Sequence, residues 1–222
     1  MSTMNDTLNS EALFIPSDDV AQDKQKHIPK SEGDYLGHII KARTTTREWE
    51  DKKTGHNFKA CIYNFKIRIA PENKEQSFTY TDRNGTQHTT NGEPYVGWEV
   101  VSKGVFRFLE PDTTKGDTFV SNATGNDRYM RFCQALKVDH KTAEREVNGK
   151  KINVQVMPIL EAEDIEGLPV TAVVGREKKD WMDSEGNMRP DYKVRWVQEW
   201  ADGAKLNTGD NDDKYQFLSS EV

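Results

Sequence analysis

One segment of regular alternation limits what this chain can fold into more than any other feature. From Phe58 to Ile69, apolar and polar side chains alternate with a period of two. Lys66 and Arg68 lie on the polar face. The apolar face consists of Cys61, Tyr63, Phe65, Ile67 and Ile69. Such a pattern predicts a β-strand in a sheet that is buried on one side.

Further strands are predicted on both sides of this segment. Gly37 lies inside the first of them, which predicts a bulge or sharp bend there. Lys103 and Gly104 interrupt another. We expect strands over residues 35–43, 95–109 and 150–160, a hairpin over 78–90 with a type I′ turn at Asn84-Gly85, and a long hairpin over 170–200 around residues 183–187.

The apolar period changes between residues 126 and 138. Apolar residues there recur at i, i+3, i+4 and i+7, which predicts an amphipathic helix with Asn126 as its N-cap. These apolar residues are Tyr129, Phe132, Cys133 and Leu136. A short second helical turn is expected over 142–147.

Three strands, a helix and two strands are the layout of the OB-fold. We therefore predict a mainly β fold, a five-stranded OB-fold-like Greek-key barrel with one helix between strands 3 and 4 and hairpin insertions. In that fold the face of strands two and three binds oligonucleotides or oligosaccharides, flanked by the loops after strands one and four.

Composition excludes several other classes of protein. Of 222 residues, 34% are hydrophobic and 31% are charged. The sequence has no run of about 18 apolar residues, the length that a membrane-spanning helix needs. Two cysteines cannot build a disulfide scaffold and are typical of a reducing compartment. Residues 1–16 lack the basic and apolar regions of a signal peptide, so we expect a cytoplasmic protein.

The net charge of −6 is unevenly distributed. Residues 1–32 carry −3 and residues 199–222 carry −4, which leaves +1 for residues 33–198. Both ends are rich in polar residues. We expect a flexible N-terminal arm over 1–32, the OB-fold-like domain over 33–200 and an acidic C-terminal tail over 201–222.

Basic and aromatic side chains are interleaved where the loop after the first strand is expected. Lys and Arg can neutralise phosphates, and aromatic rings can stack on unpaired bases. A solvated loop with a packed tryptophan would have the same composition. The candidate contacts in this loop and on the following strand are Arg43, Arg47, Trp49, Lys52, Lys53, Phe58, Lys66 and Arg68.

A second cluster of the same kind falls in the last predicted hairpin, where the loop between strands four and five should lie. Trp98, Trp196 and Trp200 occur in apolar alternation and are expected in the core instead. The candidate contacts of this second cluster are Lys178, Lys179, Trp181, Lys193 and Arg195.

The sequence offers little evidence for catalysis. The five histidines are scattered, and neither a GxxxxGK[ST] phosphate loop nor a GxSxG motif occurs. We expect no catalytic residue, metal or cofactor. Two alternatives remain: a non-catalytic virion or assembly protein, and a metal-dependent nuclease. The acids that could suggest the nuclease are Glu161, Glu163, Asp164, Glu166 and Glu177.

Four short stretches carry a resemblance to a known family. They are GDYLGHI at 33–39, FKI at 65–67, NDRYMRFCQALKV at 126–138 and VNGKKINVQV at 147–156. In this order they resemble the single-stranded-DNA-binding proteins of bacteriophage replication and recombination modules. The resemblance spans roughly residues 33–200. It implies an OB-fold, sequence-independent coating of single-stranded DNA, no catalytic residues and, for a phage protein, the host cytoplasm.

Many members of that family end in an acidic tail that recruits replication partners. Here Asp210, Asp212 and Asp213 precede an aromatic segment, but the chain ends in Ser-Ser-Glu-Val rather than in an aromatic residue. The resemblance thus implies replication or recombination proteins as partners of the tail, although this ending departs from the family pattern.

Overall fold

The computed structural model describes residues 28–50, 52, 55, 57–82, 84–110, 123–147 and 149–206. Lys53, most of the predicted arm and residues 207–222 of the predicted tail lie outside these ranges. The helical elements are η1 (Pro71–Asn73), η2 (Glu93–Tyr95), α2 (Ala123–Ala135) and α3 (Ala162–Ile165). The strands are β1 (Gly33–Glu50), β2 (Asn57–Ile69), β3 (Ser77–Thr81), β4 (Gln87–Asn91), β5 (Glu99–Ser102), β6 (Val105–Phe108), β7 (Thr142–Val147), β8 (Lys150–Gln155), β9 (Pro169–Arg176), β10 (Trp181–Met182), β11 (Met188–Arg189) and β12 (Tyr192–Gln198).

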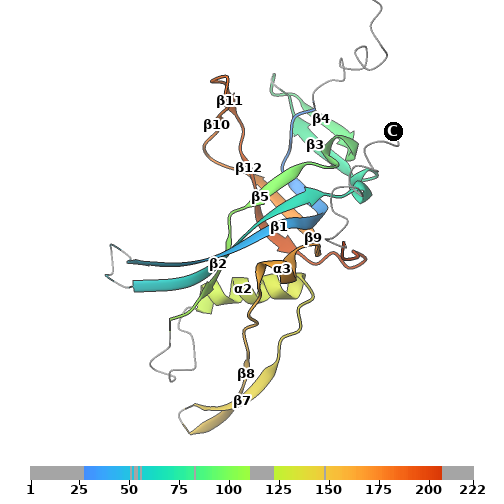
Figure 1. Cartoon of the computed structure of the whole chain (residues 1–222). Coiled ribbons are helices and arrows are strands. Elements are labelled where there is room, and N and C mark those ends of the chain that lie inside the picture. Colours follow the sequence, from blue (N-terminus) through green and yellow to red (C-terminus); the bar gives the residue numbers. More distant parts are fainter. Residues whose placement is uncertain are drawn as a thin grey trace, which may run out of the picture.

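Five strands close into a barrel in the order β1-β9-β12-β5-β2 and back to β1 (Figure 1). Every neighbouring pair is antiparallel except β12 and β5, which run parallel. Beyond the predicted interruption at Lys103 and Gly104, β6 continues along the edge of β2 on which β5 pairs. The prediction of a mainly β fold with a closed five-stranded, OB-like barrel is confirmed.

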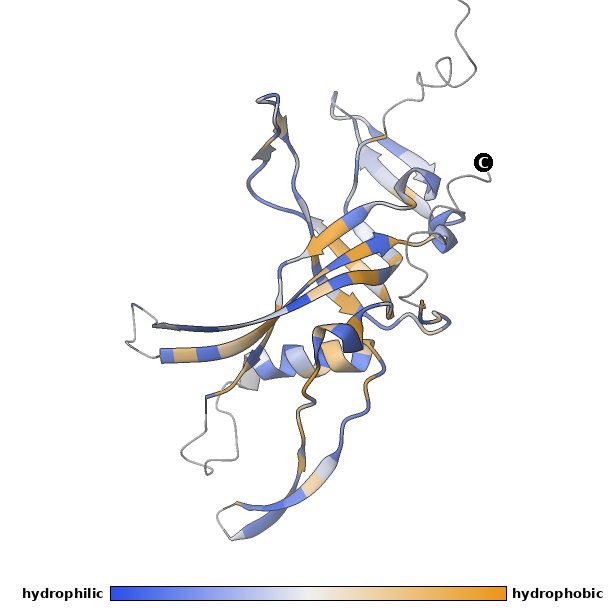
Figure 2. Ribbon diagram, in the orientation of Figure 1, coloured by the Kyte–Doolittle hydropathy of each residue, from blue (hydrophilic) through white to orange (hydrophobic). Residues whose placement is uncertain are grey.

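The inward faces of these strands form one hydrophobic core. The predicted inner face of β2 is buried from Tyr63 to Ile69. All four apolar residues of the predicted stripe join the same core, three from α2 and Leu136 from just after it, and Phe132 stacks on Phe65 with ring centroids 5.5 Å apart. Figure 2 shows the hydrophobic residues gathered on the barrel strands. The period of two therefore corresponds to a strand of the barrel wall, and the helical period corresponds to a helix whose apolar side packs against the hydrophobic core.

Two β-bulges decide which side chains face outward. One lies in β1 between Ile39 and Lys41, and the other lies in β12 between Val194 and Trp196. A bulge adds one residue to a strand and so reverses the alternation of faces beyond it. Val197 therefore packs against the core, whereas the side chain of Trp196 is 57% exposed. The prediction that Trp196 is a core residue is wrong for this reason.

The first strand is much longer than the predicted 35–43. β1 extends to Glu50 and pairs with β2 as far as Asn57, so the two strands leave the barrel as a projecting ribbon (Figure 1). The predicted loop from Arg43 to Phe58 is therefore wrong for most of its length. Continuous cross-strand hydrogen bonding explains the difference, because the Thr-rich segment 44–46 favours a strand.

Local predictions outside the barrel also need correction. Residues 142–147 form strand β7 rather than a helical turn, and with β8 they make a separate projecting hairpin instead of the predicted barrel strand over 150–160. Asn126 lies inside α2, where its side chain accepts a hydrogen bond from the Phe108 N–H at 2.9 Å instead of capping the helix. The hairpin over 78–90 is confirmed, but its turn is not type I′, because Gly85 has a positive φ of 81° and Asn84 does not.

Residues just outside the predicted domain limits of 33 and 200 contact the barrel. The hydroxyls of Ser31 and Tyr35 are hydrogen-bonded at 2.8 Å, and the Lys30 ammonium lies 4.8 Å from the ring centroid of Trp98. At the other end, the Leu206 N–H donates to the Gly167 carbonyl at 2.9 Å. Short segments of the predicted arm and tail therefore belong to the folded unit.

Candidate functional site

The outer surface of the β1–β2 ribbon and of β6 brings together basic and aromatic side chains. The strand register places Trp49 opposite Phe58, and Arg47 and Phe108 on either side of Ala60. It also places Lys41 opposite Lys66. We call this surface the ribbon face and define it by Lys41, Arg43, Arg47, Trp49, Phe58, Phe106 and Phe108.

The bulge in β1 creates the ribbon face. Before the bulge, odd-numbered residues such as Ile39 point into the barrel, and beyond it Ala42 and Thr44 pair with the inward-facing Phe65 and Tyr63. Lys41 and the odd-numbered residues after it consequently point outward. Just beyond the bulge, the Ala42 N–H donates a hydrogen bond at 2.7 Å to Oε1 of Glu166, the residue that follows α3.

Four aromatic rings form a cluster on the ribbon face. Trp49 and Phe58 stack with centroids 5.6 Å apart and an interplanar angle of 20°. Phe106 and Phe108 lie 6.2 and 6.1 Å from the Trp49 ring. Trp49 remains 37% exposed. Beside it lies an open depression of about 340 Å³ that Arg47, Glu48, Trp49, Ile62 and Phe106 line.

The cations of the ribbon face are accessible. Lys41, Arg43 and Arg47 are all exposed. Within the described part of the chain, no ion pair involves any of the three. The acid nearest in sequence, Glu48, falls on the opposite face of the ribbon and pairs there with Lys59 at 2.7 Å. These three side chains can therefore meet an external anion without first leaving an internal partner of the described chain.

Lys66 and Arg68 continue the basic row onto the barrel, as predicted, but a carboxylate lies between them. Glu99 Oε2 accepts from Lys66 Nζ at 2.8 Å. Glu99 Oε1 accepts from Arg68 Nη2 at 2.7 Å and from Arg68 Nε at 3.2 Å. These bonds, that of Lys66 above all, hold the pKa of Glu99 below its ordinary value.

The cations on β12 and beside β5 are also paired. Lys193 lies next to Val101 on the barrel surface, and its ammonium is 3.2 Å from Asp191. The Arg195 guanidinium is 3.6 Å from Glu32 and donates to the Arg176 carbonyl at 2.8 Å. Lys103, at the β5–β6 junction, pairs with Glu177 at 2.7 Å, which places the start of the β9–β10 connection beside this surface.

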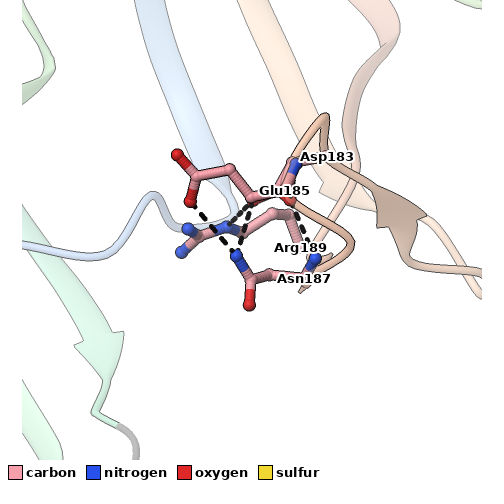
Figure 3. A network of polar contacts seen from close by, with 4 residues as sticks. All are labelled: Asp183, Glu185, Asn187 and Arg189. Atoms are coloured by element: carbon pink, nitrogen blue, oxygen red, sulfur yellow. Dashed lines mark hydrogen bonds and ion pairs between the residues drawn. The ribbon is translucent and has the colours of Figure 1, made fainter.

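The β10–β11 hairpin has a hydrogen-bonded turn and exposed apolar side chains on its two short strands. Figure 3 shows Asp183 at the centre of this turn. Its carboxylate accepts from the N–H groups of Glu185 and Asn187 at 3.0 and 2.8 Å, and from Arg189 Nε at 2.8 Å. These bonds, led by that of Arg189, lower the pKa of Asp183. The exposed apolar side chains are Trp181, Met182 and Met188.

We define the paired region as the cations Arg176, Arg189, Lys193 and Arg195, which lie on β9, β12 and the β10–β11 hairpin. Each has a carboxylate within 4 Å. Lys178 and Lys179 lie in the connection that enters the hairpin and are exposed. They make no ion pair with another residue that the structure describes.

The predicted contacts thus fall into two groups. Arg43, Arg47, Trp49, Phe58, Lys66 and Arg68 share one outward surface. Lys178, Lys179, Trp181, Lys193 and Arg195 belong to β12 and the β9–β11 segment. Lys52 is exposed at the tip of the ribbon, and Lys53 is among the residues left undescribed.

Sequence reasoning missed three residues of the ribbon face: Lys41, Phe106 and Phe108. Phe106 and Phe108 flank Arg107, and a period of two places both on one face of β6. This period could be read from the sequence, but the pairing of β6 with β2, which brings both rings to Trp49, could not. Lys41 was hidden because its orientation depends on the bulge.

Of the five acids that suggested a nuclease, four make structural contacts in this fold, including Glu177, which pairs with Lys103. Glu161 and Asp164 form a capping box at the start of α3, and Glu166 accepts a hydrogen bond just beyond the β1 bulge. The described residues contain no group of three or more His, Cys, Asp or Glu side chains placed to hold a metal ion.

Comparisons with protein-family models, with curated proteins and with solved structures give no significant match for this chain. Within the described residues, none of the helices has the length and apolar character needed to cross a membrane.

Proposed function

We propose that this protein binds single-stranded DNA without sequence preference and coats it during replication or recombination. The observation that carries the proposal is the ribbon face, where four clustered aromatic rings share one outward surface with three exposed cations that have no described ion-pair partner. Phosphates would meet Lys41, Arg43 and Arg47, while unpaired bases would stack on the aromatic cluster. Every base has a flat π-face, so such binding tolerates any sequence.

The aromatic cluster favours a single strand over a duplex. The bases of a duplex are already stacked and paired, so an exposed ring can reach them only after they are separated. Trp49 borders the open depression and is the ring with the best access to a base. In this proposal Lys66 and Arg68 extend the path along the barrel, and Lys178, Lys179 and Trp181 would contact the strand beyond it. Replication or recombination proteins would be partners of the acidic tail.

A structural role in a virion or in its assembly is the second candidate. Its supporting observation is the exposure of apolar side chains on and near the projecting hairpins, with Ile159 at 71%, Met182 at 66% and Met188 at 59%. Exposed apolar groups of this kind can mark protein–protein contacts. A protein of this class would self-associate and would have no affinity for nucleic acid.

The test is tryptophan fluorescence during titration with oligo-dT of about 30 nucleotides, long enough for more than one site. A duplex of equal length is the control, and both titrations are run at low and high salt. We expect quenching by the single strand that weakens as salt rises, because phosphate contacts release counterions. No response to either DNA at low salt and micromolar protein, with self-association in sedimentation, would replace this proposal by the structural role.

A further inference from the structure

Glu99 makes the densest set of charged contacts on the barrel's outer wall. Its two carboxylate oxygens accept from three N–H donors of Lys66 and Arg68, at 2.7 to 3.2 Å. β5 places Glu99 directly opposite Arg68, and Lys66 is the cross-strand neighbour of Lys41 on the ribbon face. The Glu99 carboxylate therefore lies on the barrel wall next to the ribbon face.

A carboxylate and a phosphodiester can accept hydrogen bonds from the same donors. Both offer paired anionic oxygens, and the arginine fork together with a lysine suits either. The three side chains are 22 to 38% exposed, so water and an incoming anion can reach them. Exposed ion pairs contribute little to the free energy of folding. Replacing the Glu99 carboxylate by another anion therefore costs little free energy.

We infer that Lys66 and Arg68 form a subsite for one backbone phosphate, and that Glu99 occupies this subsite in the free protein as an internal competitor. The inference rests on the proposed binding of single-stranded DNA and adds a residue that opposes it. A strand that reaches the subsite must displace Glu99 and then remains beside its negative charge. Glu99 consequently weakens binding and eases release of the strand.

The test is the substitution Glu99→Gln, which keeps the size of the side chain and removes its charge. Affinity for oligo-dT at low salt should increase about twofold to fivefold, the range that an exposed ion pair can supply. The dependence of log K on log salt should become steeper by up to about 0.7, because the subsite neutralises one phosphate more completely once the competing carboxylate is gone.

Glu144→Gln is the matched control. It removes the same charge and an ion pair of the same kind, with Lys151 at 2.8 Å, on the β7–β8 hairpin, which projects away from the barrel (Figure 1). Its affinity should stay within twofold of the parent protein. A third comparison introduces Glu99→Gln into a Lys66→Ala/Arg68→Ala protein, where we expect no gain in affinity.

The outcomes separate the two proposals. Binding by the parent protein with equal effects of Glu99→Gln and Glu144→Gln would overturn the role of Glu99 and leave the proposed function standing. A gain that persists without Lys66 and Arg68 would also overturn it, because the effect would then be one of general charge. Absence of binding by every variant would overturn the proposed function itself. Melting temperatures of all variants check that each is folded.

Discussion

The ribbon face and the paired region carry the same kinds of residues but present them differently. Each has an exposed tryptophan nearby: Trp49 belongs to the ribbon face, and Trp181 lies opposite Arg189 of the paired region. In the paired region, Arg176, Arg189 and Lys193 each have an aspartate two to six residues away on the same hairpin. On the ribbon, Glu48 alternates onto the opposite face and pairs with Lys59 there. Similar local composition therefore produces an accessible basic surface in one place and an internally neutralised one in the other.

This difference concerns function more than stability. Exposed ion pairs contribute about 0 to 1 kcal/mol each, so the pairs of the paired region do little for the fold. They do reduce the positive potential that an approaching phosphate meets. If single-stranded DNA is the ligand, the ribbon face should therefore supply most of the binding energy.

The largest expected effect is that of Trp49→Ala. Loss of stacking should weaken binding of oligo-dT about 5-fold to 150-fold, since one base on an aromatic ring contributes about 1 to 3 kcal/mol. Affinity is measured by anisotropy of a labelled oligonucleotide, which does not depend on the protein's own fluorescence.

Trp196→Ala is the matched control for Trp49→Ala, because Trp196 is also exposed but lies on β12 opposite Val173. We expect it to leave affinity unchanged, and Trp181→Ala to have an effect between the two. A melting temperature lowered strongly by Trp49→Ala but not by Trp98→Ala would mean that Trp49 is a core residue and that the comparison fails.

A smaller effect is expected from removal of cations. Arg43→Ala/Arg47→Ala should reduce the slope of log K against log salt by about 1.4, because two phosphate contacts are lost at about 0.7 each. Lys193→Ala/Arg195→Ala removes the same number of charges from the paired region and should change the slope by less than half as much. Equal slopes for the two double variants would show that internal ion pairs do not make a cation less available to phosphates. The distinction between the ribbon face and the paired region would then be wrong.

The smallest effect is a loss of stability in acid, and it concerns β1, the strand from which the ribbon face is built. His38 is buried on β1, where its Nε2 lies 3.1 Å from the Ala204 carbonyl, and burial lowers its pKa below the ordinary value of 6.5. The unfolded chain then binds the proton more readily, so stability is complete above about pH 6.5 and declines as the pH falls through the lowered pKa.

Melting temperatures at pH 7.5 and 5.5 test this prediction, with His38→Gln as the comparison. The variant keeps a donor for the Ala204 carbonyl and should lose less stability between the two pH values than the parent does. A parallel loss in both proteins would assign the acid sensitivity to other groups. The binding comparison of the two regions is therefore sharpest above pH 6.5.

Much of the local structure could be predicted from the sequence. The strand over residues 58–69 and the helix stripe ending at Leu136 follow from periods of 2 and 3.6, which burial of one face imposes directly. The turn at residues 183–187 follows from Asp183 and Gly186, whose side-chain acceptor and positive φ suit a tight turn. Errors concentrate where pairing with the next strand along the chain overrides the local pattern, as in residues 43–50, which pair with β2, and residues 142–147, which pair with β8.

For the candidate site, the residue types and the interleaving of basic and aromatic side chains near Trp49 can be read from the amino-acid sequence. Which of these side chains lie on the same surface depends on how distant parts of the chain pair. The bulge after Ile39 turns Lys41 and Arg43 outward, and the pairing of β6 with β2 brings Phe106 to the Trp49 ring. Strand alternation has a period of two, so one inserted residue reverses every face beyond it. The backbone on either side of this insertion is bonded to residues far away in the sequence, Ile39 to Gly167 and Leu168, and Ala42 to the Glu166 carboxylate.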